Sequence, residues 1–216
     1  MIKAASFSIS KLTLDQYLAD LGSDKPAPGG GAATAICAAQ GAALLSMCLN
    51  VSGKNDELIP NLRFDELLNY LANARRRFLE IADQDARAFE KVMACYTLPK
   101  STEEEKKKRK IELQAAFKNA AEVPFSLMEL AADILDNAND VIKATKASVI
   151  SDAAIGIDFL FTALKSSRHN VRINLNYIKD EVFVTASESK IKFLTSGRSK
   201  QKNRMQDAVK EILTAR

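Results

Sequence analysis

The sequence predicts an all-α protein, an antiparallel up-and-down helical bundle that forms a single domain over residues 1–216, and three observations support this. Alanine, leucine, lysine and glutamate dominate the composition, whereas eight glycines and five prolines are too few for a many-turned β-sandwich. Long segments place apolar residues three and four positions apart, which is the spacing of an amphipathic helix. Capping-box signals, which start helices, also recur along the chain.

The first elements follow from such local signals. Thr13 and Gln16 form a capping box that starts a short helix, and Gly22 ends it. A loop rich in proline and glycine, 25–31, then leads directly into an alanine-rich helix over about 32–51. The next helix is long, from about 61 to 96, because its apolar residues keep the helical spacing throughout.

The second half of the chain is predicted as several shorter helices. A new helix starts at a capping box formed by Ser101 with Glu104 or by Thr102 with Glu105, and Pro124 begins or kinks another that runs to about 135. Further helices are expected near 140–146, 148–166 and 170–178, with one or two more before the C-terminus. Residues 182–185 are the only strand-like run, and it is weak.

Composition excludes several classes of function. The net charge of +4, from 31 basic and 27 acidic residues, does not favour nucleic acid as a partner, and the charged run 103–110 is typical of a solvated helix face. One histidine and three scattered cysteines exclude the usual zinc sites and a disulfide framework, so we expect no metal and a reducing compartment, the cytoplasm.

Segment 32–51 is long and apolar enough to raise the question of a membrane span. Its many alanines and its interspersed polar residues favour a buried helix instead, so no membrane association is expected. Residues 1–10 lack the apolar stretch of a secretory signal.

A helical wheel of the long helix selects one candidate catalytic residue. With Phe78 as origin, Asp85 lies about 20° away, inside the apolar stripe, whereas Asp83 lies on the opposite side. A carboxylate in an apolar stripe costs several kcal/mol unless it is paired, hydrogen-bonded or protonated. Asp85 is therefore either an acid/base group with a raised pKa or a core aspartate satisfied by a neighbour, and the wheel does not choose between them.

Three further groups are candidates on weaker grounds. Asp152 lies at the edge of an apolar stripe, where it could move protons or simply stand near a helix start. Asn174, between two apolar residues, either points inward or satisfies a neighbouring backbone group. Gly29, Gly30 and Gly31 precede a helix and could admit an anionic ligand to the backbone, although a plain turn explains them as well.

These pieces together resemble the cyclodeaminase family, which comprises the cyclodeaminase domain of formiminotransferase-cyclodeaminase and stand-alone methenyltetrahydrofolate cyclohydrolase-like proteins. The resemblance covers residues 10–180. No single motif is specific for the family, but the set of motifs in this order is. These are Pro26-Ala-Pro-Gly-Gly-Gly31, Gly41-Ala-Ala-Leu, Gly53-Lys54, Asp83-Gln-Asp85-Ala-Arg-Ala-Phe89, Leu98-Pro99-Lys100, Ala120-Ala-Glu-Val-Pro124, Ser151-Asp152 and Asn170-Val-Arg-Ile-Asn-Leu175.

The resemblance implies an all-helical homodimer that acts on a tetrahydrofolate derivative, with or without a polyglutamate tail, and uses no cofactor beyond that substrate. The family's acid/base aspartate corresponds to Asp85, and Asp152 is a second catalytic candidate. The folate pocket would be lined by the Gly-rich loop, Lys54 and Asn174; within the loop the candidates are Pro28, Gly29, Gly30 and Gly31. Asn55 stands where the family often has a second basic residue, so contacts to the glutamate tail are expected to be weaker.

Two reactions fit this expectation. The first is the cyclodeaminase reaction, which converts 5-formiminotetrahydrofolate to 5,10-methenyltetrahydrofolate and ammonia. The alternative is the cyclohydrolase reaction, which converts 5,10-methenyltetrahydrofolate to 10-formyltetrahydrofolate. The sequence does not choose between them, because attack by N10 and attack by water require similar acid/base groups. A non-catalytic helical scaffold is the distant alternative.

Overall fold

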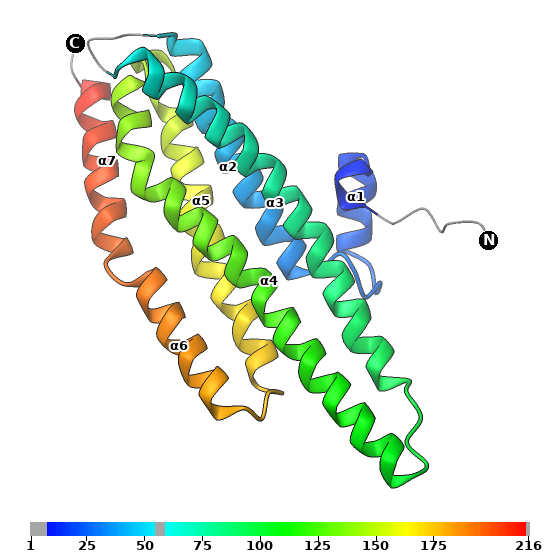
Figure 1. The fold of residues 1–216 in the computed structure, drawn as a ribbon. Coiled ribbons are helices and arrows are strands. Elements are labelled where there is room, and N and C mark those ends of the chain that lie inside the picture. Colours follow the sequence, from blue (N-terminus) through cyan, green and yellow to red (C-terminus); the bar gives the residue numbers. More distant parts are fainter. Residues whose placement is uncertain (1–7, 55–58, 215–216) are drawn as a thin grey trace.

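The structure, a computed structural model, describes residues 8–54 and 59–214, and it is helical throughout this part of the chain (Figure 1). For Asn61 and Leu62 only the backbone is described. The elements in order are η1 (Ile9–Lys11), α1 (Leu14–Leu21), α2 (Gly30–Ser52), α3 (Asn61–Tyr96), α4 (Glu103–Ala144), η2 (Ala147–Val149), α5 (Ile150–Leu175), α6 (Glu181–Thr195) and α7 (Arg198–Thr214).

Helices α2, α3, α4 and α5 alternate in direction and form the centre of the bundle (Figure 1). Each packs along its neighbours, α2 on α3 and α5, and α4 on the same two, so that α2 and α4 lie diagonally opposite. Their apolar stripes enclose one hydrophobic core, which includes Phe78, Phe125, Leu45 and Ile150. The predicted all-α antiparallel bundle is confirmed.

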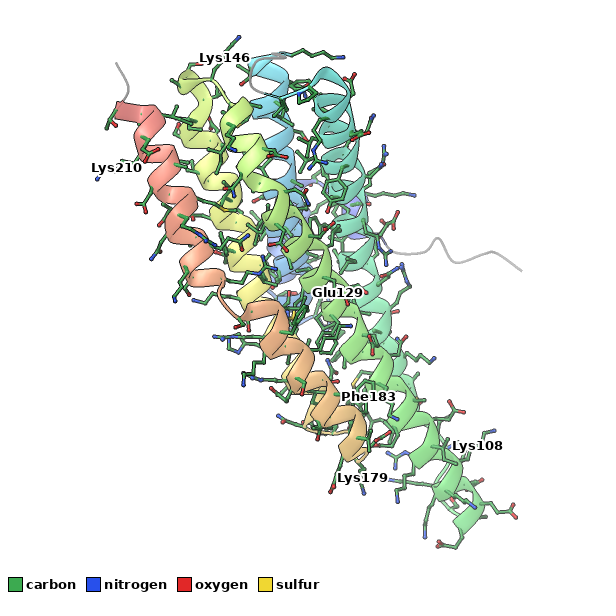
Figure 2. The ribbon with its side chains drawn as sticks, turned by 60° about the vertical axis from the view of Figure 1, so that its left-hand side comes forward. Lys108, Glu129, Lys146, Lys179, Phe183 and Lys210 are labelled. Atoms are coloured by element: carbon green, nitrogen blue, oxygen red, sulfur yellow. The ribbon has the colours of Figure 1, made fainter. Side chains whose placement is uncertain are left out.

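Helices α6 and α7 cover the outer side of α4 and α5 (Figure 2). Lys190 of α6 pairs with Glu129 of α4 at 2.9 Å, and Phe183 of α6 lies beneath the ammonium of Lys118, 5.2 Å from its Nζ. Met205 and Val209 are the buried residues of α7. Away from α6 and α7, η1 packs on α3 and leads into α1 (Figure 1).

Helices α2 and α5 approach each other closely at two glycines. A Cβ on Gly41 would lie 2.7 Å from the carbonyl oxygen of Gly156, and a Cβ on Gly156 would lie 3.0 Å from the carbonyl oxygen of Gly41. The two backbones are therefore in direct contact, which only glycine permits here. By length and hydropathy alone, α2 and the segment Ala147–Leu175 could each cross a membrane, but here they pack together inside the bundle.

The helix boundaries confirm some predictions and correct others. The capping boxes Thr13–Gln16 and Thr102–Glu105 are both formed. Pro124 does not begin a helix: it lies buried inside α4, which absorbs the segment predicted near 140–146.

The segments predicted at 148–166 and 170–178 are also one helix, α5, and Ser167 lies inside it with its hydroxyl donating to the carbonyl of Ala163 at 2.9 Å. The strand-like run 182–185 is the first turn of α6, capped by Asp180, whose carboxylate accepts from the N–H of Phe183.

Unequal helix lengths create space at one end of the bundle. Helix α2 has 23 residues, whereas α3 has 36 and α4 has 42. The end of α3 and the start of α4 therefore continue beyond the N-terminus of α2 (Figure 1). The last part of α3, residues 85–96, is about 16 Å long at 1.5 Å per residue.

Candidate active site

A cavity of about 430 Å³ fills the space beyond the N-terminus of α2. Small-molecule sites are commonly of about 300–1,000 Å³, so the cavity is large enough for a substrate. The loop before α2, the last turns of α3 and α5, and the middle of α4 form its walls. The lining residues are Pro26, Ala27, Gly29, Gly30, Gly31, Asp85, Ala86, Ala88, Phe89, Val92, Met93, Tyr96, Phe117, Ala120, Asn170, Ile173, Asn174 and Tyr177.

The carboxyl group of Asp85 lies directly against the first turn of α2. A Cβ on Gly31 would overlap both carboxylate oxygens, so glycine is required at this position. The backbone N–H of Ala32 donates a hydrogen bond to the same carboxylate. Asp85 thus caps the N-terminus of another helix, and this contact explains one of the three consecutive glycines.

Two opposing effects act on the pKa of Asp85. Burial disfavours the charged carboxylate and raises the pKa, whereas the hydrogen bond from Ala32 lowers it. Burial is the larger effect, so the pKa of Asp85 is raised above its usual value. A carboxyl group with a raised pKa that lines a cavity is suited to both taking and giving a proton.

The side chain of Asn174 binds a backbone carbonyl of α4 that lacks its usual helical donor. Pro124 has no N–H, so it cannot donate to the carbonyl of Ala120, four residues earlier in α4. The side-chain Nδ2 of Asn174 donates to this carbonyl at 3.2 Å, and also to the carbonyl of Asn170 at 2.8 Å. Asn174 therefore satisfies a backbone group and lines the cavity at once, with its Oδ1 left to accept from a ligand.

The part of the cavity away from Asp85 is aromatic. The rings of Phe117 and Tyr177 stack at a centroid distance of 4.9 Å, and Tyr96 meets Phe117 edge-on at 6.5 Å. Phe89 and Tyr96 of α3 are about two-fifths exposed and also line this cavity. Phe117, Tyr177 and Asn170 were not predicted as site residues, because no local signal connects three separate segments.

Asp83 has a different role from its neighbour Asp85. It was expected to face solvent, but its carboxylate accepts from the Ile9 N–H at 2.7 Å and from the Ser8 hydroxyl at 2.8 Å. It anchors the N-terminal segment on α3 and does not line the cavity.

Within one chain the structure does not bring Asp152 or Lys54 to the cavity. Asp152 lies 18 residues before Asn170 in α5, about 27 Å along the helix. It is near Cys48, whose thiol pKa is raised to about 11 by burial and, to a lesser degree, by the Asp152 carboxylate. Lys54 lies at the same end of the bundle and pairs with Asp65 at 2.5 Å. Pro28 is buried behind the cavity wall.

A buried carboxyl group, an oriented amide and an aromatic wall around one cavity define an enzyme-like site for acid/base chemistry on a planar small molecule. Comparison with known proteins is consistent with this class. Residues 13–193 match the family described as formiminotransferase-cyclodeaminase. The chain belongs to this enzyme family.

Relatives of two architectures are similar to this chain. The methenyltetrahydrofolate cyclohydrolase of Methylorubrum extorquens is 32% identical, over 92% of this chain and 96% of the relative. The formimidoyltransferase-cyclodeaminase of Rattus norvegicus is 30% identical over 87% of this chain, which spans only 35% of that longer protein. Among solved structures, the formiminotetrahydrofolate cyclodeaminase of Thermotoga maritima superposes with a TM-score of 0.78 at 26% identity, over 95% of this chain and 97% of that one.

Proposed function

We propose that this protein performs acid/base chemistry at the one-carbon bridge between N5 and N10 of a tetrahydrofolate, and that its reaction is formimidoyltetrahydrofolate cyclodeamination. The observation that carries the proposal is the carboxyl group of Asp85, which is buried against the N-terminus of α2 and faces a cavity of substrate size. The family match and the names of the relatives supply the substrate class.

In the proposed reaction the formimino group of 5-formiminotetrahydrofolate is protonated (C=NH₂⁺). N10 attacks its carbon, the C=N electron pair moves onto the NH₂ nitrogen, and the Asp85 carboxylate takes the N10 proton. The resulting tetrahedral carbon carries an amino group, which leaves as ammonia once Asp85 returns the proton to it. Formation of the C–N10 bond and loss of the C–NH₂ bond leave 5,10-methenyltetrahydrofolate. One carboxyl group with a raised pKa serves both transfers, and such help is worth about 10²–10⁴-fold in rate.

The second candidate is methenyltetrahydrofolate cyclohydrolase, and one comparison favours it equally. The relative that matches this chain over nearly its whole length carries that name. Here water adds to the methenyl carbon and Asp85 takes one of its two protons. That proton goes to N5 as the bond between N5 and the carbon breaks, and the remaining hydroxyl proton is released to solvent as the formyl C=O forms. Both reactions pass through a tetrahedral carbon between N5 and N10, so one cavity serves either.

The substrate contacts follow from the lining of the cavity. We propose that Gly29, Gly30 and Gly31 admit the ligand to the backbone and that Asn174 Oδ1 accepts from a pterin N–H. The aromatic wall of Phe117 and Tyr177 packs against a flat ring of the substrate. Neither reaction changes the oxidation level of the one-carbon unit, so we propose no redox cofactor. The proposed compartment is the cytoplasm, in keeping with three free cysteines.

The absorbance of the methenyl product tests the function directly. Incubation of the purified protein with 5-formiminotetrahydrofolate is expected to raise this absorbance and to release ammonia in equal amount. Incubation with 5,10-methenyltetrahydrofolate separates the second candidate, because a cyclohydrolase depletes the same absorbance. Absence of turnover in both assays refutes both candidates and leaves the scaffold hypothesis.

We further propose that the protein is a homodimer, because α2 has a second apolar face. Ile36, Ala43, Met47 and Val51 are only partly covered, although Ile36 and Met47 also touch the core, and α2 carries no charged residue between Gly30 and Ser52. A two-fold axis perpendicular to α2 would lay the face of one copy on the same face of the other. That arrangement moves the Asp152 and Lys54 of one copy toward the cavity of its partner, where they would take the catalytic and binding roles implied by the family resemblance.

Mixing of inactive variants tests the shared site. Under this proposal Asp85→Asn and Asp152→Asn are each inactive as homodimers, but mixed dimers contain one intact site. Equal mixing after dissociation is expected to restore about a quarter of wild-type activity, because half of the dimers are mixed and each has one working site. Sedimentation as a monomer, or an absence of restored activity, contradicts the shared site without affecting the assignment of Asp85.

A further inference from the structure

Beyond the active site, we infer that α7 and α5 form a binding site for a phosphate group, either free or carried on a small metabolite. A second cavity, of about 320 Å³, lies where α7 begins and is walled by α5, α7 and the end of α6. Four basic side chains and no acidic one line it: Lys165, Arg168, Arg198 and Lys202. Three hydroxyl groups, of Thr162, Thr195 and Ser199, complete its polar lining.

Only two of the four cations are neutralised by carboxylates. Arg198 forms a two-bond pair with Asp136, and Lys202 lies 2.9 Å from Asp158. Among the residues that the structure describes, no carboxylate lies within ion-pairing distance of Lys165 or Arg168. The cavity therefore keeps an excess of about two positive charges, which a phosphate dianion would balance.

Arg168 carries the strongest requirement for a ligand. Its Nε is buried, and no group in residues 8–54 or 59–214 accepts a hydrogen bond from it. A buried donor without an acceptor destabilises the folded state, and the cost is larger for a charged group. Arg168 also lines a neighbouring cavity of about 570 Å³ together with Arg172, Lys192 and Glu188, and there Glu188 pairs with Arg172 at 2.8 Å. A planar guanidinium beside lysines and hydroxyls suits the tetrahedral oxygens of phosphate.

The charge pattern of α7 is consistent with the same ligand. Arg198, Lys200, Lys202 and Arg204 fall within its first seven residues, and no acidic residue occupies its first turn. Cations near a helix N-terminus are unfavourable because that end of the helix is already partly positive. The residue before the helix is Gly197, which has no side chain to cap it. An anion at this position would relieve both effects.

The site is separate from the active site. Two residues along a helix turn by about 200°, so Arg168 and Asn170 leave α5 on nearly opposite sides. Helix α7 also lies outside residues 13–193, the part that matches the family. Phosphate binding can therefore be tested independently of folate turnover.

The test is calorimetric titration and thermal unfolding of the full chain with inorganic phosphate, at constant ionic strength. Millimolar or tighter binding is expected, and about 20 mM phosphate should raise Tm by about 3 °C or more. Arg168→Gln and Lys165→Gln should each weaken binding about tenfold. Arg75→Gln, which removes a charge from an exposed residue of α3, is the matched control and should bind as the wild type does.

The outcomes divide clearly. If ribose 5-phosphate binds more tightly than inorganic phosphate, the group is carried on a metabolite; equal binding indicates the free ion. Absence of phosphate binding, or equal weakening in the Arg75 control, overturns the inference. Binding of a short RNA but of neither small phosphate also overturns it. Should Arg168→Gln fail to fold, the exposed Lys165 variant decides.

Discussion

The two ends of α2 carry similar groups but differ in what surrounds them. At its N-terminus, Asp85 lies buried against Gly31 beside the 430 Å³ cavity. At its C-terminus, Asp152 is only partly buried, lies near Cys48 and does not line that cavity. The difference arises because α3 and α4 extend beyond the N-terminus of α2 and so leave space for a cavity at that end (Figure 1). Of the two aspartates, the one that lines a cavity is the one at the end of α2 beyond which the neighbouring helices continue.

The most severe test of this comparison is Asp85→Asn. Asparagine has the same shape as aspartate, and its amide oxygen still accepts from the N–H of Ala32, but it cannot transfer a proton. We therefore expect kcat to fall about 10²–10⁴-fold in the methenyl absorbance assay. Asp83→Asn is the matched control two residues away, because its carboxylate only anchors the N-terminal segment. Equal loss in both variants would show that the effect is structural.

The next largest effect is expected from Gly31→Ala. The added methyl group would overlap the Asp85 carboxylate and displace it, and a displacement of about 1 Å at a reacting group can cost about 10²-fold in rate. Gly22→Ala is the control, since Gly22 lies outside the cavity and a Cβ there would come no closer than 3.4 Å to another atom. If the two variants retain the same kcat, the close approach of Gly31 to Asp85 has no role in catalysis.

A smaller effect is expected from Pro124→Ala. Alanine restores an N–H that competes with Asn174 for the carbonyl of Ala120. Loss of one positioning hydrogen bond predicts a rise in KM of roughly 3–10-fold. The melting temperature should be unchanged or higher, because α4 loses an internal proline. A variant with lower stability and unchanged KM would contradict this role of Pro124.

The smallest effect concerns stability and pH. A carboxyl group whose pKa is raised on folding stabilises the folded state below its unfolded pKa, and this contribution is lost as pH rises through the folded pKa. The free energy of unfolding of Asp85→Asn should therefore improve relative to wild type as pH rises from about 4 to about 7. Urea unfolding at several pH values measures it. If the difference in free energy of unfolding between Asp85→Asn and wild type does not change with pH, burial does not raise the pKa of Asp85.

Local and periodic signals predicted much of the fold. The bounds of α3 follow from its apolar spacing, and two capping boxes marked the starts of α1 and α4. The wrong predictions concern segments whose structure is set by contacts with other helices and not by their local sequence. Pro124 is tolerated because a side chain from α5 takes the freed carbonyl, and residues 182–185 are helical because Asp180 caps them and pairs with Lys118.

The candidate site was predictable only in part. The wheel placed Asp85 inward because its helix carries one apolar stripe, and the glycine run was recognised as a place of close approach. The aromatic wall could not be predicted, since Phe117 and Tyr177 come from elements 60 residues apart in sequence that meet only in the folded chain. The position of Asp152 likewise depends on the length of α5. The polar residues around Ser167 had predicted two shorter helices in place of this one.

The contact between Gly41 and Gly156 has a mechanical consequence. Where these two glycines cross, no side chain separates the backbones, so α2 cannot shift along α5 without a clash of main-chain atoms. We therefore expect the cavity to adjust to a substrate through bending of the projecting ends of α3 and α4, with Gly31 and the start of α2 held in place.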